Sequence, residues 1–304
     1  MIDMKISGFS FCRNAAKLYY PVAESIRSVL PICDEFIVAV GKGDPDDTTR
    51  EVIEAIGDPK IRIIDTEWTD REKLQGWIHS QQTNIALNAC SGDWCLYVQS
   101  DEVVHEKDLP LIQRRAEALM DDRRVEGLAF RYLHFWGDYG HVHRSHAWYP
   151  TEIRMIRNGM GIQSFRSAQS FRREGKRLRG VDIGAEMFHY GWVRPPRLMR
   201  VKSYEMIHTH HGKQRAEELH GQSAGVFNYG SLEQIPPFAG THPAVMKEWI
   251  ARFDWGDQLQ YTGPSPVRHR HDQPKQRILT WIEQNLLFGR MRLGTKPFRR
   301  VWGA

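Results

Sequence analysis

The chain contains 304 residues, of which 41% are hydrophobic and 26% charged, a balance typical of globular proteins rather than of disordered or fibrous ones. The formal charge of +5 is a mild bias, compatible with an anionic substrate, an acidic membrane surface or nucleic acid. The sequence shows no run of 18 apolar residues, no signal-peptide pattern over residues 1–11 and no CxxC pair, so we expect a cytoplasmic protein in a reducing compartment.

The first part of the chain alternates between apolar strands and helices. Residues 4–11 and 35–40 predict strands, and residues 15–30 predict a helix that begins near Pro21, because proline suits the first turn of a helix. Another helix with three inward aliphatic residues precedes a third strand at 61–64. Such alternation predicts parallel βαβ units.

The segment 93–102 is the clearest candidate for a site. A predicted helix at 79–89 leads into a short apolar strand that ends in Asp101 and Glu102. Ligands of open α/β sheets bind just outside the carboxyl ends of the strands. Two adjacent carboxylates there suit a divalent cation and the diphosphate that it neutralises. The alternative is an ordinary solvated acidic loop.

The second half has a different pattern. Residues 108–120 predict a helix, and residues 125–135, 152–156 and 185–190 predict strands. The intervening segment 136–148 is rich in Gly, His and aromatic residues. It predicts a binding loop whose rings stack on sugars, although a surface loop with incidental aromatics has the same composition.

Two further helices are predicted at 197–211 and 276–288, with a linker at 264–274. Five basic residues follow the last helix, between 290 and 300. Such a tail either lies on an anionic membrane surface or ends a helix that packs into the core, and we favour the core-packed helix. Neither a GxGxxG nor a GxxxxGK[ST] motif is present, so the sequence lacks a dinucleotide fingerprint and a P-loop.

The segments 7–14, 33–41 and 46–49 resemble the opening of family 2 glycosyltransferases, and 94–102 is similar to the strand that carries their Asp-x-Asp-Glu motif. The resemblance covers most of residues 4–105 and continues more loosely to about residue 196. It implies an α/β GT-A fold, with a Rossmann-like, mostly parallel sheet flanked by helices. It also implies inverting transfer of a sugar from a nucleotide-diphosphate sugar, usually with Mg²⁺ or Mn²⁺.

On this basis we expect a GT-A domain at 1–196 and a helical C-terminal extension with a basic amphipathic tail at 197–304. Within the domain, residues 1–105 would form the nucleotide-sugar half and residues 106–196 the acceptor half. The acceptor is expected to be a glycan or glycolipid in cell-envelope polysaccharide synthesis. The enzyme would then lie in the cytoplasm, peripherally on the inner face of the membrane.

One position departs from the family pattern. Gln99 stands where the family usually has the first Asp of its motif, while Asp101 matches the second Asp, which commonly ligates the metal. His189 fits the histidine ligand that the GT-A fold often supplies late in the chain, although a hydrogen-bonded core histidine would look the same. The resemblance thus implies Mg²⁺ or Mn²⁺ at Asp101 and His189.

The resemblance also implies contacts with the nucleotide-sugar donor, which we carry over by position. Asp46 or Asp47 would equally serve as a helix cap, and Gln82 and Asn84 would equally be exposed helix positions. The expected donor-binding residues are Phe11, Arg13, Asn14, Asp46, Asp47, Gln82, Asn84, Gln99 and Ser100.

Inverting transfer needs a base that takes the proton of the acceptor hydroxyl. Three acids lie at suitable positions, Asp138, Glu152 and Asp182, and we choose Glu152 because it begins a short strand after the aromatic segment. The alternating acid and arginines of that strand would also fit a salt-bridged exposed face. Arg154, among others, would help to hold the diphosphate or an anionic acceptor.

Other functions fit less well. A sugar nucleotidyltransferase of similar fold would carry a glycine-rich phosphate loop near the N-terminus, which is missing. A nucleic-acid-binding protein would show a stronger basic bias or a recognised motif. The 14 histidines do not have the spacing of a Cys/His zinc site.

Overall fold

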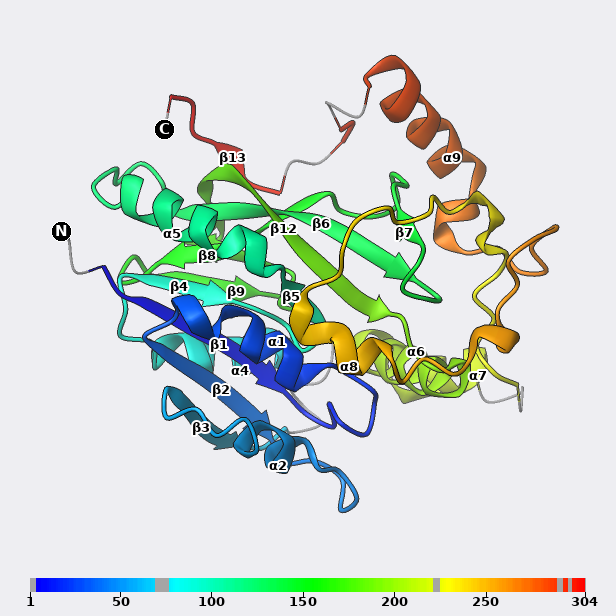
Figure 1. Ribbon diagram of the computed structural model, residues 1–304, viewed down its shortest axis with the longest axis horizontal. Helices are drawn as coiled ribbons and strands as arrows, with labels where there is room; N and C mark the ends of the chain where they lie inside the picture. Colours follow the sequence, from blue (N-terminus) through cyan, green and yellow to red (C-terminus); the bar gives the residue numbers. More distant parts are fainter. Residues whose placement is uncertain (1–3, 69–76, 221–224, 289–291, 295–296, 304) are drawn as a thin grey trace.

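The computed structural model describes residues 4–68, 77–220, 225–288, 292–294 and 297–303, and its architecture is α/β (Figure 1). Along the main sheet the strands follow the order β13-β12-β6-β8-β4-β1-β2-β3, with β5 beside β12 and β7 beside β6. These strands are Ile6–Cys12 (β1), Glu35–Gly41 (β2), Ile61–Thr66 (β3), Trp94–Tyr97 (β4), Glu102–Val104 (β5), Gly127–Trp136 (β6), Val142–His143 (β7), Thr151–Arg157 (β8), Arg179–Trp192 (β12) and Arg299–Arg300 (β13). A small second sheet contains Ile162–Phe165 (β9), Ser170–Arg173 (β10) and Lys176–Arg177 (β11).

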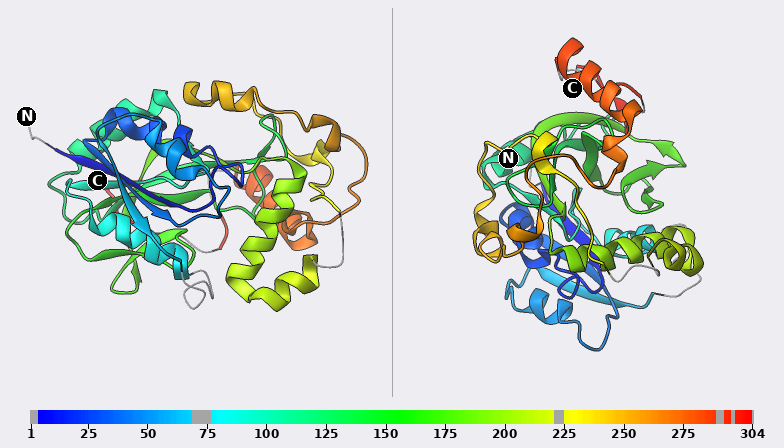
Figure 2. Two further views of the ribbon diagram at one scale, coloured as in Figure 1. Left: turned by 90° about the horizontal axis from the view of Figure 1, so that it is seen from below. Right: turned by 90° about the vertical axis from the view of Figure 1, so that its right-hand side faces the viewer.

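Helices cover both faces of the main sheet, with α1 and α5 on one face and α4 on the other (Figure 2). None of the described helices is both long and apolar enough to span a bilayer. The helices are Val22–Val29 (α1), Thr49–Glu54 (α2), Trp77–Asn88 (α4), Leu109–Ala118 (α5), Pro196–His211 (α6), Lys213–His220 (α7), Lys247–Ile250 (α8) and Pro274–Trp281 (α9). Single 3-10 turns occupy Leu30–Ile32, Glu106–Asp108, Leu232–Gln234, Ala244–Met246, Gly256–Gln258 and Arg270–Asp272.

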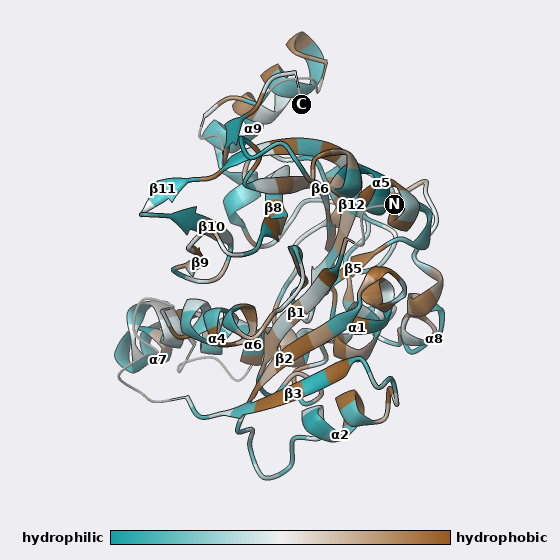
Figure 3. Ribbon diagram, turned by 90° about the vertical axis from the view of Figure 1, so that its left-hand side faces the viewer, coloured by the Kyte–Doolittle hydropathy of each residue, from teal (hydrophilic) through white to brown (hydrophobic). Residues whose placement is uncertain are grey.

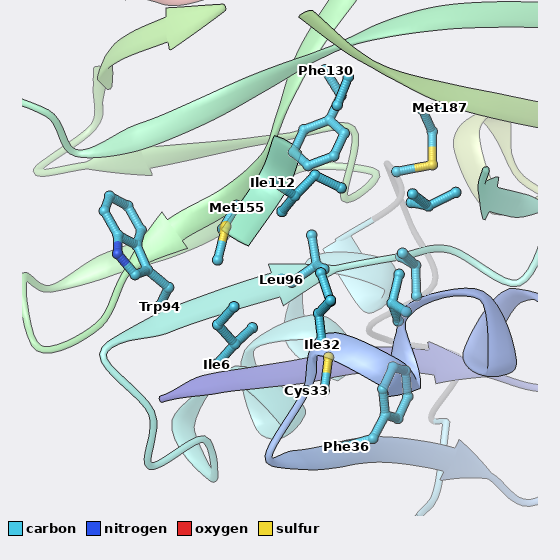
Figure 4. Packing of buried hydrophobic residues seen from close by; sticks show 14 of the residues in the cluster. Ile6, Ile32, Cys33, Phe36, Trp94, Leu96, Ile112, Phe130, Met155 and Met187 are labelled. Atoms are coloured by element: carbon cyan, nitrogen blue, oxygen red, sulfur yellow. The ribbon is translucent and has the colours of Figure 1, made fainter. Parts of the chain in front are cut away.

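The parallel half of the sheet explains the unbroken apolar runs of its strands. Successive side chains of a strand point to opposite faces. In β2, Phe36 and Val38 enter the cluster beneath α1, whereas Ile37 and Ala39 enter the cluster beneath α4. Figure 4 shows Phe36 next to Cys33 at one end of the first cluster, which also contains side chains from β1, β4 and α5. Both faces are therefore buried, and the predicted βαβ arrangement is confirmed.

Most strands of the main sheet have their carboxyl ends at the same edge. Strands β1, β2, β3 and β4 are parallel, and β6 is parallel to β12. Between these groups β8 runs antiparallel to both β4 and β6. Consequently β1, β2, β4, β6 and β12 all end at the edge where β8 begins. The expected α/β fold with a mostly parallel sheet is confirmed.

The aromatic segment 136–148 packs largely inside the protein. Trp136 and Tyr139 are 2% and 6% exposed, and they share one hydrophobic cluster with Trp249 and Trp255 of the C-terminal extension. The expectation of an exposed sugar-stacking loop is thus wrong for these two rings, because the extension covers them. The predicted extension, residues 197–304, contains most of α6 and joins the sheet through this common core.

The last helix departs from the prediction. The α-helical part, α9, ends at Trp281, and a single π-helical turn, Ile282–Leu286, follows it directly. Ile278, Trp281 and Leu286 are 57–60% exposed, and the helix stands at the periphery of the molecule (Figure 3). The prediction that this helix packs into the core is therefore wrong.

The predicted cap of α2 also differs. The N-cap residue of this helix is Thr48, not Asp46 or Asp47, and no side chain forms a capping hydrogen bond there.

Candidate active site

Asp101 lies in the turn between β4 and β5, at the edge where the strands end. The backbone N–H of Tyr190 donates to the Asp101 carbonyl at 2.8 Å, and β5 pairs antiparallel with β12 so that Glu102 lies opposite His189. These backbone bonds fix Asp101 beside the end of β12. A residue from the first third of the chain thereby meets residues nearly 90 positions later.

The Asp101 carboxylate is surrounded by positive charge. It is 7% exposed, and its Oδ2 lies 3.2 Å from Lys202 Nζ on α6 and 3.8 Å from His189 Nε2. Burial by itself raises the pKa of Asp101, but nearby positive charge, chiefly that of Lys202, outweighs burial and lowers it to about 2. Asp101 is consequently ionised throughout the physiological range.

His189 is held as a neutral ring. His134 lies between it and a carbonyl, with Nε2 2.7 Å from the Tyr149 oxygen and Nδ1 3.0 Å from His189 Nδ1. If His134 donates to that carbonyl, its Nδ1 accepts the proton of His189 Nδ1, and His189 Nε2 keeps a lone pair facing Asp101. Burial lowers the pKa of both histidines, which favours this uncharged pair.

These donors do not by themselves fit a divalent metal. No group of three or more His, Cys, Asp or Glu side chains is placed to hold a metal ion within the described residues. Asp101 and His189 supply two donor atoms, and the Lys202 ammonium lies on the same carboxylate oxygen. The Lys202 ammonium would repel a divalent ion held by that oxygen. Mg²⁺ or Mn²⁺ stays a prediction from the resemblance.

Glu102 points away from Asp101 and has a structural partner. Its two carboxylate oxygens accept from Arg154 Nε and Nη2 at 2.8 and 2.7 Å, and the pair is fully buried. The Tyr132 hydroxyl donates to the same carboxylate at 2.6 Å. The interpretation of Asp101 and Glu102 as two carboxylates that share a cation is therefore wrong. Arg154 is likewise engaged and does not reach for a diphosphate.

Glu152 lies at the start of β8, on the same edge. Its Oε1 accepts from Gln169 Nε2 at 3.0 Å, whereas its buried Oε2 has no hydrogen-bond partner among the described residues. Gln99 Nε2 donates to the carbonyl of Ala168, the neighbour of Gln169, at 3.3 Å. The end of β4 and Glu152 thus contact one short segment, in which Ala168 has the left-handed φ of 58° that side-chain-bearing residues rarely adopt.

Burial raises the pKa of Glu152. A buried carboxylate with one unpartnered oxygen is costly for stability, and such groups concentrate at functional sites. The other two candidate bases are engaged. Both oxygens of Asp138 contact His141 Nδ1 at 2.8 and 3.0 Å, and Asp182 pairs with Arg131 at 3.1 Å. Asp182 precedes His189 by seven residues on β12, roughly 20 Å along the strand, so the structure does not place it beside Asp101.

The residues expected to contact the nucleotide meet at the ends of β1 and β2. Asn14 has a φ of 54°, and its Oδ1 accepts from the Asp44 N–H at 2.8 Å. Arg13 Nε donates to the Lys42 carbonyl at 2.9 Å. Phe11 packs against the Trp68 ring at 6.2 Å between centroids. These contacts join the loop after β1 to the loop after β2.

The remaining expected donor contacts divide into two groups. Asp46 forms an ion pair with Lys17 at 2.6 Å, Asp47 accepts from the Thr49 hydroxyl, and Ser100 donates to the Phe11 carbonyl at 3.4 Å. These three lie in the loops at the strand ends. Two residues of α4 make bonds within the fold instead, Gln82 with the Thr66 hydroxyl and Asn84 with the Ser164 N–H. Their roles toward a donor stay predictions.

Lys202 and Arg194 are the residues that the sequence analysis missed. Arg194 is fully buried near Asp101, with its guanidinium 4.2 Å from the centre of the Tyr20 ring. Both cations lie beyond the segment with the strongest resemblance, and neither belongs to a recognisable motif. The available signal was a helix that begins at Pro196, shortly after β12, because a lysine in its second turn falls near the end of that strand.

No family model and no curated protein matches this chain. Among solved structures, TarS from S. aureus is 15% identical, with coverage of 71% of this chain and 42% of that chain and a TM-score of 0.39. Residues 1–349 of TarS in complex with UDP match at 16% identity, 71% and 69% coverage and a TM-score of 0.37. Glucosyl-3-phosphoglycerate synthase from Mycobacterium tuberculosis, in complex with Mn²⁺, UDP and phosphoglyceric acid, matches at 18% identity, 43% and 44% coverage and a TM-score of 0.30. This chain thus spans less than half of full TarS and of the synthase, and similarity at this level does not establish a family.

We expect Arg154→Met to lower the free energy of unfolding by about 3–5 kcal/mol, because it leaves the Glu102 carboxylate buried without a cation. The double variant Arg154→Met/Glu102→Gln should recover part of that loss, because no buried charge remains. Urea unfolding measures both, with Arg131→Met as the exposed control, expected to cost less than about 1 kcal/mol. An Arg154→Met effect as small as the control's would contradict the structural role.

We expect Glu152→Gln to raise the melting temperature at neutral pH. The folded-state pKa of Glu152 lies above its unfolded value, so ionisation disfavours the fold increasingly as pH rises through the folded pKa. Below the unfolded pKa both states are protonated and the gain should vanish. Thermal unfolding of wild type and variant from pH 4 to pH 8 tests this, and a variant that melts earlier at every pH would refute it.

Proposed function

We propose that the protein is a glycosyltransferase that moves a sugar from a nucleotide-diphosphate sugar to a glycan or glycolipid acceptor. The observation that carries the proposal is that segments resembling family 2 glycosyltransferases meet at one sheet edge. Ser100 bonds to Phe11, and Asn14 bonds to Asp44, so the ends of β1, β2 and β4 form one surface. Buried Glu152 is the second residue of β8, at the same edge.

The positions of Glu152 and Asp101 support separate roles for them in an inverting transfer. The acceptor hydroxyl attacks the anomeric carbon while Glu152 takes its proton, and the bond between that carbon and the diphosphate oxygen breaks. The raised pKa of Glu152 makes it a stronger base than an exposed glutamate. The leaving diphosphate carries the departing electron pair and needs positive charge beside it, which Asp101 and its partners organise.

We expect purified protein to release a nucleoside diphosphate from a nucleotide sugar when a suitable acceptor is present. Glu152→Gln should keep donor binding and lower transfer about 10²- to 10⁴-fold, because it removes the base. Asp182→Asn is the matched control and should leave both near normal. Product analysis and donor titration measure the two steps, and full transfer by Glu152→Gln would exclude Glu152 as the base.

Product analysis distinguishes a glycosyltransferase from a sugar nucleotidyltransferase. A sugar nucleotidyltransferase would release pyrophosphate from a nucleoside triphosphate and a sugar phosphate. A nucleic-acid-binding protein would bind random duplex DNA with steep salt dependence and ignore nucleotide sugars. Among the described residues, no contact or charge cluster specifically favours a nucleotidyltransferase or a nucleic-acid-binding protein.

We propose that the protein works on cell-envelope polysaccharide at the cytoplasmic face of a membrane and contacts that membrane peripherally. Ile278, Trp281, Leu286 and Phe288 expose 57–76% of their surface around α9. Trp302 is 77% exposed beside the guanidinium of Arg300. Exposed aromatic and aliphatic side chains next to arginines suit the interface of an anionic bilayer.

We expect the protein to co-sediment with vesicles that contain phosphatidylglycerol and much less with pure phosphatidylcholine vesicles. The double variant Trp281→Ser/Trp302→Ser should reduce binding several-fold, because it removes two interfacial anchors. Trp77→Ser, at an exposed tryptophan on α4, controls for loss of a surface ring. Equal vesicle binding by the wild type, the double variant and Trp77→Ser would contradict the membrane contact.

A further inference from the structure

Lys202 has the environment of a fixed cation rather than of a surface lysine. Its side chain is 14% exposed. The ammonium donates to Asp101 Oδ2 at 3.2 Å and to the Gly191 carbonyl at 2.6 Å. It also lies 4.9 Å from the centre of the Tyr20 ring and 5.7 Å from that of the Trp192 ring. Two hydrogen bonds and two aromatic faces thus hold one charge in place.

The backbone at Gly191 is shaped around this charge. A Cβ at this position would lie 2.6 Å from Asp101 Oδ2 and 2.7 Å from His189 Nε2, so the close approach requires glycine. The Gly191 carbonyl accepts from Lys202 and from Arg194 Nη2, the latter at 3.2 Å. One carbonyl therefore holds two cations near the end of β12.

The charges of this cluster leave a net positive site. Lys202 and Arg194 contribute two positive charges, and Asp101 contributes one negative charge. An ammonium has three N–H donors. Two of those of Lys202 are used by Asp101 and Gly191 among the described residues, which leaves one for an incoming anion.

We infer that Lys202, in place of a divalent metal, neutralises the diphosphate that leaves the anomeric carbon. This inference rests on the glycosyltransferase function proposed above. As the bond from carbon to the diphosphate oxygen breaks, the electron pair stays on that oxygen, and the Lys202 N–H donates a hydrogen bond to the diphosphate without giving up its proton. The acceptor proton goes to Glu152, and the negative charge that develops on the diphosphate is met by the Lys202 ammonium, with Arg194 nearby. Asp101 acts as the positioning residue that aims the ammonium.

The first experiment uses the wild-type protein and measures binding rather than turnover. Thermal shift and calorimetry with UDP, GDP, CDP and dTDP are carried out in excess EDTA and again with Mn²⁺ or Mg²⁺. We expect at least one nucleotide to bind in EDTA with an affinity within about threefold of that with metal, since the protein supplies the cation. Binding that appears only with metal overturns the inference but leaves the proposed function intact. No binding in either condition overturns both.

The second experiment tests the residue. In EDTA, Lys202→Met should weaken binding of that nucleotide about tenfold or more, because it removes a charge-assisted hydrogen bond. Lys202→Arg should keep part of the affinity, and Arg197→Met, at an exposed cation of the same helix, should bind like wild type. Unchanged binding by Lys202→Met overturns the inference. If that variant does not fold, Lys202→Arg and the metal-free wild-type measurement decide the question.

Discussion

The ion pair between Glu102 and Arg154 holds the turn after β4 against β8 inside the sheet. Because both side chains are fully buried and Arg154 donates to both oxygens of Glu102, the backbone on either side of Glu102 has little freedom. Its neighbour Asp101 is therefore presented at the edge of the sheet in one orientation. The two adjacent acids therefore differ in role, because Glu102 forms a buried structural ion pair and Asp101 belongs to the candidate site.

The site is built around compensated charge. Asp101 is surrounded by Lys202 and Arg194, while His189 and His134 stay neutral through burial and their shared hydrogen bond. The cations are in turn held by the Gly191 carbonyl and the Tyr20 ring. Such a preorganised group of dipoles and charges is suited to meet negative charge that develops on a leaving group.

The C-terminal extension completes this site. Its first helix contributes Lys202, and its later segments cover the aromatic residues at the end of β6 through Trp249 and Trp255. The segments that resemble glycosyltransferases lie mostly before residue 105, but the cations beside Asp101 come from after residue 190. Residues 1–105 alone would leave Asp101 without its charged partners.

The sequence by itself determined strands β1 to β4, helices α1, α2 and α4, the α/β class and the position of Asp101 at a strand end. Local patterns carry these features, because apolar periodicity and the proline at α1 act between near neighbours. Only the tertiary structure decided that Glu102 and Arg154 form a buried pair, that the aromatic segment is core and that α9 is exposed. Each of these depends on contacts between residues tens to more than a hundred positions apart, and strand pairing and the packing of the extension, not local spacing, bring them together.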